Sequence, residues 1–293
     1  MDNDTKHVLT ILGFVACFGA GYFVYGAENK DTIKTGEKFS VFSQIENTLD
    51  GKKEMPDDEE KAMENAVNGY YQTNDKYFDY FSSDAESTDN TKNYDYLNSY
   101  QINDNIVYIN SDSFLMDGIQ GFTKFFRDNP NPEAGGYIID LRENVGGLTN
   151  YSINVLGYFI EPQTIGEYHY YNGDRKDLKV SGDKKTNGEK VVILVNENTM
   201  SAAEIFIASM KQFYDDTVIV GTKTFGKGTF QEYEPLSDNK QFRYTAGYYT
   251  VGNWQCYDGM GISPDIEVSM EYNPDIICTD DDIQLQAAYD LFK

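Results

Sequence analysis

Histidine, cysteine and basic residues are scarce in this chain of 293 residues, and each shortage excludes a class of function. Only 24 lysines and arginines stand against 48 aspartates and glutamates, so the formal net charge is −24. Nucleic acids and anionic lipid headgroups both require a basic face on the protein that binds them. We therefore expect no nucleic acid as a partner and no docking on lipid headgroups, and we assign the acidic excess to solubility.

The chain has two histidines, His7 and His169, and three cysteines, Cys17, Cys256 and Cys278. A zinc protease with paired histidines cannot be built from this set, and no C-x-x-C motif supports a zinc ribbon or thioredoxin chemistry. A Ser-His-Asp triad would depend on His169 alone, which lies in a polar and aromatic stretch and is expected at the surface. Cys256 and Cys278 can form a disulfide outside the cytoplasm, but the sequence leaves open whether they meet.

An apolar run without a charged residue covers residues 8–27 and ends at Glu28. Its length suits a membrane-spanning helix, and its composition also suits a cleavable signal. We favour an uncleaved anchor for residues 1–27, and either interpretation places the rest of the chain outside the cytoplasm, anchored or secreted. The polar residues 28–60 predict a stalk.

The remainder divides into a helical segment with a polar loop, residues 61–101, and a core, residues 102–293. Apolar residues at helical spacing predict a helix over residues 61–80, and residues 82–95 form a low-complexity loop. Strands alternate with helices in the core, which predicts an α/β fold. The predicted strands cover residues 105–110, 136–141, 190–196, 217–221 and 242–251, and the predicted helices cover residues 117–128, 152–160, 202–213 and 283–292.

Residues 140–147, DLRENVGG, form the first of three segments that can carry chemistry. A predicted buried strand leads directly into Gly146 and Gly147. Adjacent glycines allow backbone N–H groups to approach a ligand closely and to form an anion-binding nest. An ordinary turn between a strand and a helix is the simpler interpretation of this pair on its own.

Residues 198–204, NTMSAAE, follow the next predicted strand. Ser201 and Glu204 have the spacing of a capping box, which makes Ser201 the N-cap of a helix. A nucleophile suits the same position, because the helix N-terminus stabilises negative charge on an attacking oxygen and on an oxyanion. Taken alone, the segment fits the capping role more simply.

Residues 221–231, GTKTFGKGTFQ, resemble a phosphate-binding loop, with a strand followed by G-x-x-x-x-G-K. The match fails because Gly228 stands where a serine or threonine must hold Mg²⁺, and because an alternating pattern rather than a helix follows. We therefore expect no nucleotide site. Lys227 is then either a surface lysine in a hairpin or a general base, since burial in an apolar place promotes loss of its proton.

These three segments, together with GMGISPDIEV at residues 259–268, resemble the carboxyl-terminal processing (tail-specific) serine proteases. The resemblance covers about residues 62–293. It implies an α/β fold with a crotonase-like (ClpP-like) peptidase core and an N-terminal helical segment, and it implies neither a cofactor nor a metal.

The resemblance also implies a role for individual residues. Ser201, which begins S-A-x-E, corresponds to the nucleophile, and Lys227 of F-G-K-G corresponds to the general base. Gln231 corresponds to the residue that orients this lysine. The backbone N–H groups of Ala202 and of the Gly146–Gly147 turn correspond to the donors of the oxyanion hole.

The implied function is that of an extracytoplasmic serine endopeptidase acting on protein or peptide substrates through an acyl-enzyme. Whether it cuts near substrate C-termini stays open. Most members carry a PDZ domain between the first helix and the core, and the two dozen or so residues between Phe81 and Asn105 are too few for one. We therefore expect a member that lacks this domain. The oligomeric state is not indicated.

Two other functions remain as alternatives. A non-catalytic module on the same fold would bind peptides or apolar ligands, but it would have no need of Ser201, Lys227 and Gln231 together. A surface interaction protein is suggested by the 24 tyrosines and 18 phenylalanines, although many of them fall in strands and helices predicted to be buried.

Overall fold

The computed structural model describes residues 59–82, 97–236, 240–254 and 258–293, and the chain divides into two compact units, Met1–Ala66 and Val67–Lys293. The anchor or signal, residues 28–58 of the expected stalk and residues 83–95 of the expected loop lie outside the described residues, as do Cys17 and Cys256. Among the helices that are described, none has the length and hydropathy needed to cross a bilayer. Cys278 carries a free thiol.

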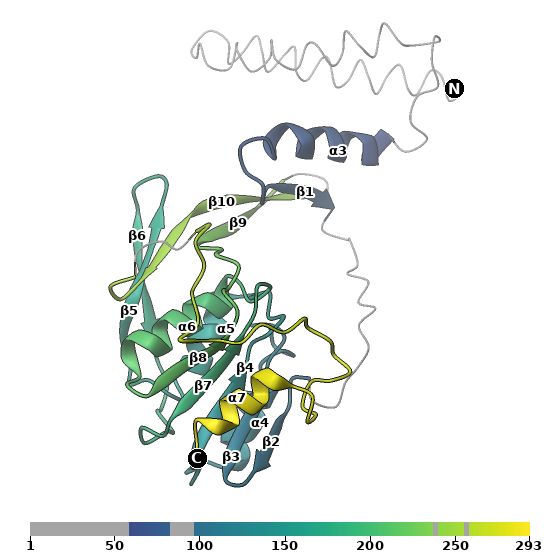
Figure 1. Cartoon of the computed structure of the whole chain (residues 1–293). Helices are drawn as coiled ribbons and strands as arrows, with labels where there is room; N and C mark the ends of the chain where they lie inside the picture. The colour runs from purple at the N-terminus through teal and green to yellow at the C-terminus, as the bar shows by residue number, and fades with distance from the viewer. Residues whose placement is uncertain (1–58, 83–96, 237–239, 255–257) are drawn as a thin grey trace, which may run out of the picture. The chain divides into compact units, whose positions relative to one another are not determined.

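A six-stranded sheet forms the centre of the second unit (Figure 1). Its strands are β2 (Tyr100–Asn103), β3 (Ile106–Asn110), β4 (Gly136–Asp140), β7 (Val191–Val195), β8 (Thr217–Gly221) and β11 (Ile266–Glu267). Their order is β11-β8-β7-β4-β3-β2, and every neighbouring pair is parallel except β2 with β3. Strands β3, β4 and β7 are buried at every residue, as expected where helices cover both faces of a sheet.

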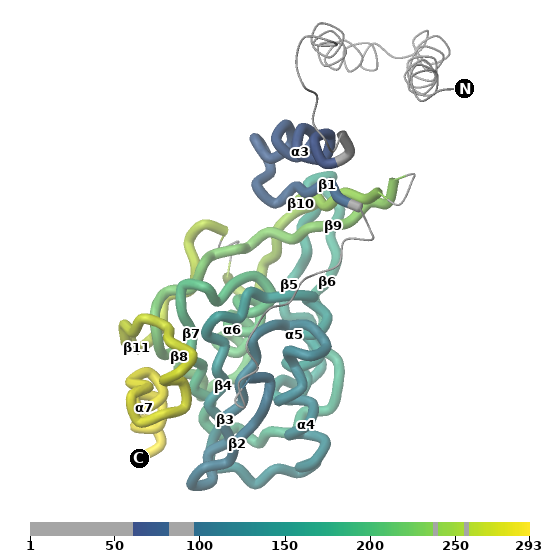
Figure 2. The backbone as a smooth tube through the Cα atoms, turned by 90° about the vertical axis from the view of Figure 1, so that its right-hand side faces the viewer, coloured from purple at the N-terminus to yellow at the C-terminus, as the bar shows by residue number. Residues whose placement is uncertain are grey.

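Helices cover the two faces of this sheet unequally (Figures 1 and 2). One face packs against three helices, α4 (Gln120–Asp128), α5 (Thr149–Leu156) and α6 (Ala202–Phe213). The opposite face packs against α7 (Ile283–Asp290). Because side chains alternate along a strand, Ile139 joins the first cluster, whereas its neighbour Ile138 joins the second with Leu285 of α7. The structure thus confirms the α/β class.

A second sheet is antiparallel and packs beside the first. Its strands are β1 (Asp79–Ser82), β5 (Gln163–Tyr170), β6 (Arg175–Val180), β9 (Thr229–Pro235) and β10 (Lys240–Val251). Strand β9 pairs along one edge of β10. On the other edge, β1 pairs with residues 240–243 and β5 with residues 247–251. Residues close to the start of the described chain therefore lie against a strand near its end.

The structure differs from the sequence-based expectation in residues 61–80. Helix α3 (Glu59–Tyr71) ends at Tyr71, and a turn then leads into strand β1. The turn is closed by the Asp75 carboxylate, which accepts a hydrogen bond from the backbone N–H of Tyr77 at 3.0 Å. Such local bonding by Asp competes with helix formation, and the aromatic residues that follow favour a strand.

His169 also differs from expectation, because it is not a surface residue. It lies in β5 with its ring stacked on Tyr248 of β10, at 4.8 Å between ring centres. Its Nε2 atom lies 3.2 Å from the hydroxyl of Thr250. The side chain is therefore half-buried between two paired strands and makes its contacts within the second sheet.

Candidate active site

Three loops that carry the sequence motifs leave the carboxyl ends of adjacent parallel strands. Residues 141–147 follow β4, residues 196–201 follow β7 and residues 222–228 follow β8. Backbone hydrogen bonds tie the loops together: Met200 N donates to Asn144 O at 3.0 Å, and Phe225 N donates to Thr199 O at 3.0 Å. Ligand sites of open α/β sheets form at this edge, so the motifs meet where a site is expected.

Ser201 stands at the turn between β7 and α6 in an uncommon backbone conformation, with φ 59° and ψ −118°. A non-glycine residue in such a region costs about 1–3 kcal/mol and needs support from its surroundings. Gly146 supplies part of that support, since a Cβ atom there would lie 2.9 Å from Ser201 Cβ. Only glycine allows this approach, and its own φ of +89° also favours glycine.

The three backbone N–H groups expected to bind an oxyanion differ in whether they already have a hydrogen-bond acceptor. The Gly146 N–H donates to Asn144 Oδ1 at 2.9 Å and is therefore engaged. Within the described part of the chain, the N–H groups of Ala202 and Gly147 have no hydrogen-bond acceptor. Ala202 is the first residue of α6, so its N–H lies at the positive end of the helix dipole.

Glu204 joins the turn that carries Ser201 to the loop that carries Lys227, whereas the capping box predicts only its bond to Ser201. Its carboxylate is fully buried and accepts four hydrogen bonds. One oxygen accepts from Ser201 N at 3.0 Å and from Lys227 N at 2.8 Å. The other accepts from Thr224 Oγ1 at 2.5 Å and from Gly226 N at 2.8 Å. Since one oxygen binds both backbones, Ser201 and Lys227 are fixed close together.

Lys227 lies in an environment that favours its neutral form. Burial lowers the pKa of the ammonium group, and the positive charges of Arg243 and Lys76 lower it further. The carboxylates of Asp258 and Asp75 act in the opposite direction without cancelling the effect. A lysine with a lowered pKa has the property required of a general base.

The Lys227 side chain points to a partner that the sequence did not indicate. Its Nζ atom lies 4.4 Å from the centre of the Tyr77 ring. Over the residues that the structure describes, Nζ makes no hydrogen bond to Ser201 or Gln231, and Gln231 Nε2 is buried without a partner. The structure thus brings Ser201 and Lys227 together through Glu204 but does not bond Gln231 to the lysine.

Tyr249 of β10 is a second residue that the motifs did not indicate. Its ring is buried, and its hydroxyl donates to Thr229 O at 3.0 Å. Burial raises the pKa of Tyr249, while the adjacent Ser201 hydroxyl lowers it by hydrogen bonding. The phenol therefore lies next to the candidate nucleophile. Alternation along residues 242–251 could have indicated that this side chain faces inward, but not what it faces.

A buried ion-pair network supports the turn at the end of β4. Arg142 donates to Asp140 Oδ1 at 2.9 Å and to both Asp282 oxygens, at 2.8 and 2.9 Å. Burial alone would lower the pKa of Arg142, but these carboxylates raise it overall. Because Asp282 is also the N-cap of α7, the network connects the C-terminal helix to the glycine turn.

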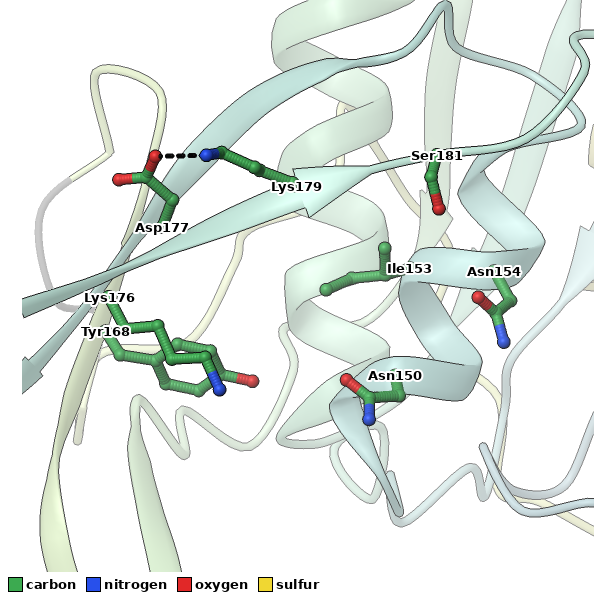
Figure 3. A pocket seen from close by; sticks show the side chains of 8 residues that line it. All are labelled: Asn150, Ile153, Asn154, Tyr168, Lys176, Asp177, Lys179 and Ser181. Atoms are coloured by element: carbon green, nitrogen blue, oxygen red, sulfur yellow. Dashed lines mark ion pairs between the residues drawn. The ribbon is translucent and has the colours of Figure 1, made fainter.

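A surface pocket lies between α5 and strands β5 and β6 (Figure 3). Its lining includes Asn150 and Asn154 of α5, Tyr168 of β5 and Lys176 and Lys179 of β6. None of the candidate catalytic residues lines it, so it is separate from the loops described above. The Lys179 ammonium is paired with Asp177 at 2.9 Å.

Comparisons with known proteins agree with the motifs. The probable CtpA-like serine protease of Staphylococcus epidermidis is 35% identical over 134 residues, which cover 45% of this chain and 27% of the relative. The carboxyl-terminal-processing protease of Synechocystis is 35% identical over 159 residues, which cover 54% of this chain and 37% of the relative. The chain thus matches well under half the length of these curated relatives.

Similarity of fold extends further along the chain. A lipoprotein from Streptococcus agalactiae shares the fold with a TM-score of 0.61 at 19% identity, covering 87% of this chain and 88% of that one. The model of peptidase family S41 matches residues 105–268, which include all three loops and more than half of the sequence. This chain therefore belongs to peptidase family S41, the family of the carboxyl-terminal processing proteases that its motifs resemble.

Proposed function

We propose that this chain is a serine endopeptidase that cleaves protein or peptide substrates with Ser201 as nucleophile and Lys227 as general base. The observation that carries the proposal is the buried Glu204 carboxylate, which binds the backbones of both residues. The lowered pKa of Lys227 adds the chemical property that this pairing requires. Membership in peptidase family S41 supports the same reaction.

The proposed reaction begins when neutral Lys227 accepts the proton of the Ser201 hydroxyl. The Ser201 oxygen attacks the peptide carbonyl carbon, and the carbonyl oxygen becomes an oxyanion near the N–H groups of Ala202 and Gly147. The Lys227 ammonium then donates its proton to the leaving nitrogen, and the C–N bond breaks to give an acyl-enzyme. Water, activated by the same lysine, releases the acid product and restores the serine.

The step requires a rotation of the Lys227 side chain, because its Nζ rests on Tyr77 rather than on Ser201. We assign Gln231 the role of holding the rotated ammonium through its amide oxygen. Its position supports this role: Gln231 lies in β9, four residues after Lys227, and its amide nitrogen is buried without a partner in the described part of the chain.

The wider setting belongs to the same proposal. We infer a crotonase-like core that lacks a PDZ domain and that acts outside the cytoplasm, held by the apolar residues 8–27 or secreted after their removal. Addition of protease to intact cells tests the location. Cleavage between residues 30 and 61 is the expected result, and full protection of this stretch would reverse the orientation.

The catalytic proposal is tested with the full chain and an unfolded protein substrate. Mass spectrometry of the fragments is compared with that of the Ser201→Ala variant, and a fluorophosphonate probe shows whether Ser201 forms a covalent adduct. We expect fragments and the adduct only with the unsubstituted chain. Lys227→Ala abolishes both, whereas Lys223→Ala, an exposed lysine of the same loop, leaves both unchanged.

The same experiment distinguishes a peptidase from a non-catalytic binding module. Cut sites in the fragments show whether cleavage is confined to substrate C-termini. Equal turnover by the parent chain and the Ser201→Ala variant would refute the nucleophile assignment. Absence of both fragments and adduct, together with binding of a peptide, would favour the non-catalytic module.

A further inference from the structure

The turn between α3 and β1 is fastened to the strand pair that follows Lys227. The Asp75 carboxylate accepts hydrogen bonds from Thr245 N at 2.6 Å and from Thr245 Oγ1 at 2.7 Å. The Arg243 guanidinium donates to Tyr77 O at 3.1 Å and lies 3.7 Å from the carboxylate of Asp79. With the pairing of β1 and β10, these contacts fix the turn on β10.

The turn lies over the face of β9 and β10 that carries Gln231. Thr245 and Gln231 are directly opposite each other in the antiparallel register. Side chains at opposite positions project from the same face of the sheet. Because Asp75 binds the Thr245 side chain, the turn covers this face next to the residue assigned to orient Lys227.

Tyr77 brings its ring from this turn to the lysine. Lys227 Nζ lies 4.4 Å from the ring centre, and Lys76 Nζ lies 4.7 Å from the same centre. The ring face attracts a cation and not a neutral amine, since the attraction acts between the charge and the ring quadrupole. The Tyr77 hydroxyl is buried and has no partner among the described residues, so the ring rather than the hydroxyl makes the contact.

We propose that Tyr77 is a positioning residue of the Ser-Lys site, whose ring holds the charged Lys227 ammonium apart from Ser201 until the lysine gives its proton to water. The inference rests on the proposed function. Loss of the proton ends the attraction, and the neutral amine is then free to rotate toward the Ser201 hydroxyl. The Tyr77 ring thus makes the position of Lys227 Nζ depend on the charge of the lysine.

Four other charged groups near Lys227 affect its pKa. Lys76 lies on the same turn as Tyr77, Arg243 lies on β10, and the carboxylates of Asp75 and Asp258 oppose their effect. Arg243 contacts Tyr77 only through the backbone carbonyl, so it keeps this contact when the side chain is replaced. Lys76 rests on the same ring, so the replacement is also made in the Lys76→Ala background. A change that removes only the ring face therefore isolates its contribution.

The test replaces Tyr77 with leucine, which fills apolar space but has no ring. Loss of the attraction destabilises the ammonium, so the pKa of Lys227 falls and the acid limb of the kcat/KM profile moves to lower pH. The expected shift is about half a unit to one pH unit. The matched control is Tyr77→Phe, which keeps the ring and loses only the unpartnered hydroxyl, and its profile should coincide with that of the parent.

A second readout does not require activity. Lysines are reductively methylated with ¹³C, and Lys227 is titrated by NMR, with Lys227→Arg used to assign its signal. Thermal unfolding checks that each variant folds, and Tyr77→Met replaces the leucine variant if that one does not, because a flexible thioether fills irregular space. The titration should move in the same direction as the activity profile.

The outcomes are distinct. A downward shift for Tyr77→Leu with no change for Tyr77→Phe supports the proposal. Equal titration of the leucine variant and the parent overturns it, and so does an upward shift, which would mean that the ring only shields the lysine from water. A downward shift in a chain that cleaves nothing would support the contact between ring and ammonium and refute the proposed function instead.

Discussion

Replacement of Glu204 by glutamine gives a direct test of the arrangement around Ser201 and Lys227. The two oxygens of the carboxylate accept four hydrogen bonds, two from the backbones of Ser201 and Lys227 and two from Thr224 and Gly226. Glutamine has nearly the same shape, but one of its two terminal groups is an NH₂, which cannot accept. Whichever way the amide turns, at least one buried backbone N–H loses its acceptor.

The size of the effect follows from these bonds. A hydrogen bond to a charged group contributes about 1.5–3 kcal/mol, and a buried donor left without an acceptor costs about 1–3 kcal/mol. We therefore expect Glu204→Gln to lower the free energy of unfolding by about 2–4 kcal/mol. Catalysis should fall as well, mainly in kcat, because the carboxylate no longer holds both the backbone of the proposed nucleophile and that of the proposed base.

The assay is urea unfolding of the full chain together with steady-state cleavage of a peptide. Ser209→Ala is the matched control, since Ser209 is also fully buried in α6 and its hydroxyl has no partner in the part of the chain described. It should leave stability and activity close to those of the parent. The reasoning would be refuted if Glu204→Gln unfolded with the midpoint of the parent and kept its kcat.

Three further predictions address the surroundings of the site. Lys76→Ala removes a positive charge that lowers the pKa of Lys227, so this pKa should rise and the acid limb of the kcat/KM profile should move to higher pH. The shift should be smaller in high salt, which screens the charge of Lys76, and the control Lys223→Ala should not produce it. Tyr249→Phe removes the hydroxyl beside Ser201 and should lower kcat several-fold with little change in KM, whereas Tyr248→Phe should change neither; equal kinetics for the two variants would exclude a role for that hydroxyl. Asp282→Ala removes two charge-assisted hydrogen bonds to Arg142, which keeps its pair with Asp140, and the N-cap bond to Leu285 N, so it should destabilise the fold by about 2–4 kcal/mol in urea unfolding, while Asp281→Ala, at an exposed neighbour, should have no effect.

The central sheet could be predicted from the sequence because its signals are local and strong. Residues 136–140 and 191–195 are continuous apolar runs, and these strands are buried at every position. Helix α6 and strand β8 have the predicted limits, residues 202–213 and 217–221. The absence of a helix after Lys227 was also predicted, and strand β9 stands there.

The second sheet was largely missed, for a physical reason. Strands β5 and β6 are mostly exposed or half-buried and rich in polar residues, so they lack the apolar runs that mark a core strand. Strand β1 was expected to be part of a helix. Its pairing with β10 joins Asp79 to Arg243, a contact far apart in the sequence that no local pattern could reveal.

In the candidate site, too, some residues could be predicted from the sequence and others could not. Ser201 and Lys227 were chosen because their motifs resemble those of a known family, since each segment taken alone also fitted a structural role. Tyr77 and Tyr249 could not be chosen in this way, because each reaches the site only through the pairing of strands in the second sheet. For Glu204, the spacing predicted one of its four hydrogen bonds, the one to Ser201 N, and the fold supplied the rest.

The two interpretations of Ser201, helix cap and nucleophile, are therefore compatible. The Glu204 side chain accepts from Ser201 N as in a capping box, and the same oxygen accepts from Lys227 N. A cap alone would not need the positive φ of Ser201 or the glycine packed against its Cβ, both of which add constraint to an already strained turn. Strain that is held by this many contacts is expected where a side chain must keep one position for chemistry, and a helix end exposed to water has no such requirement.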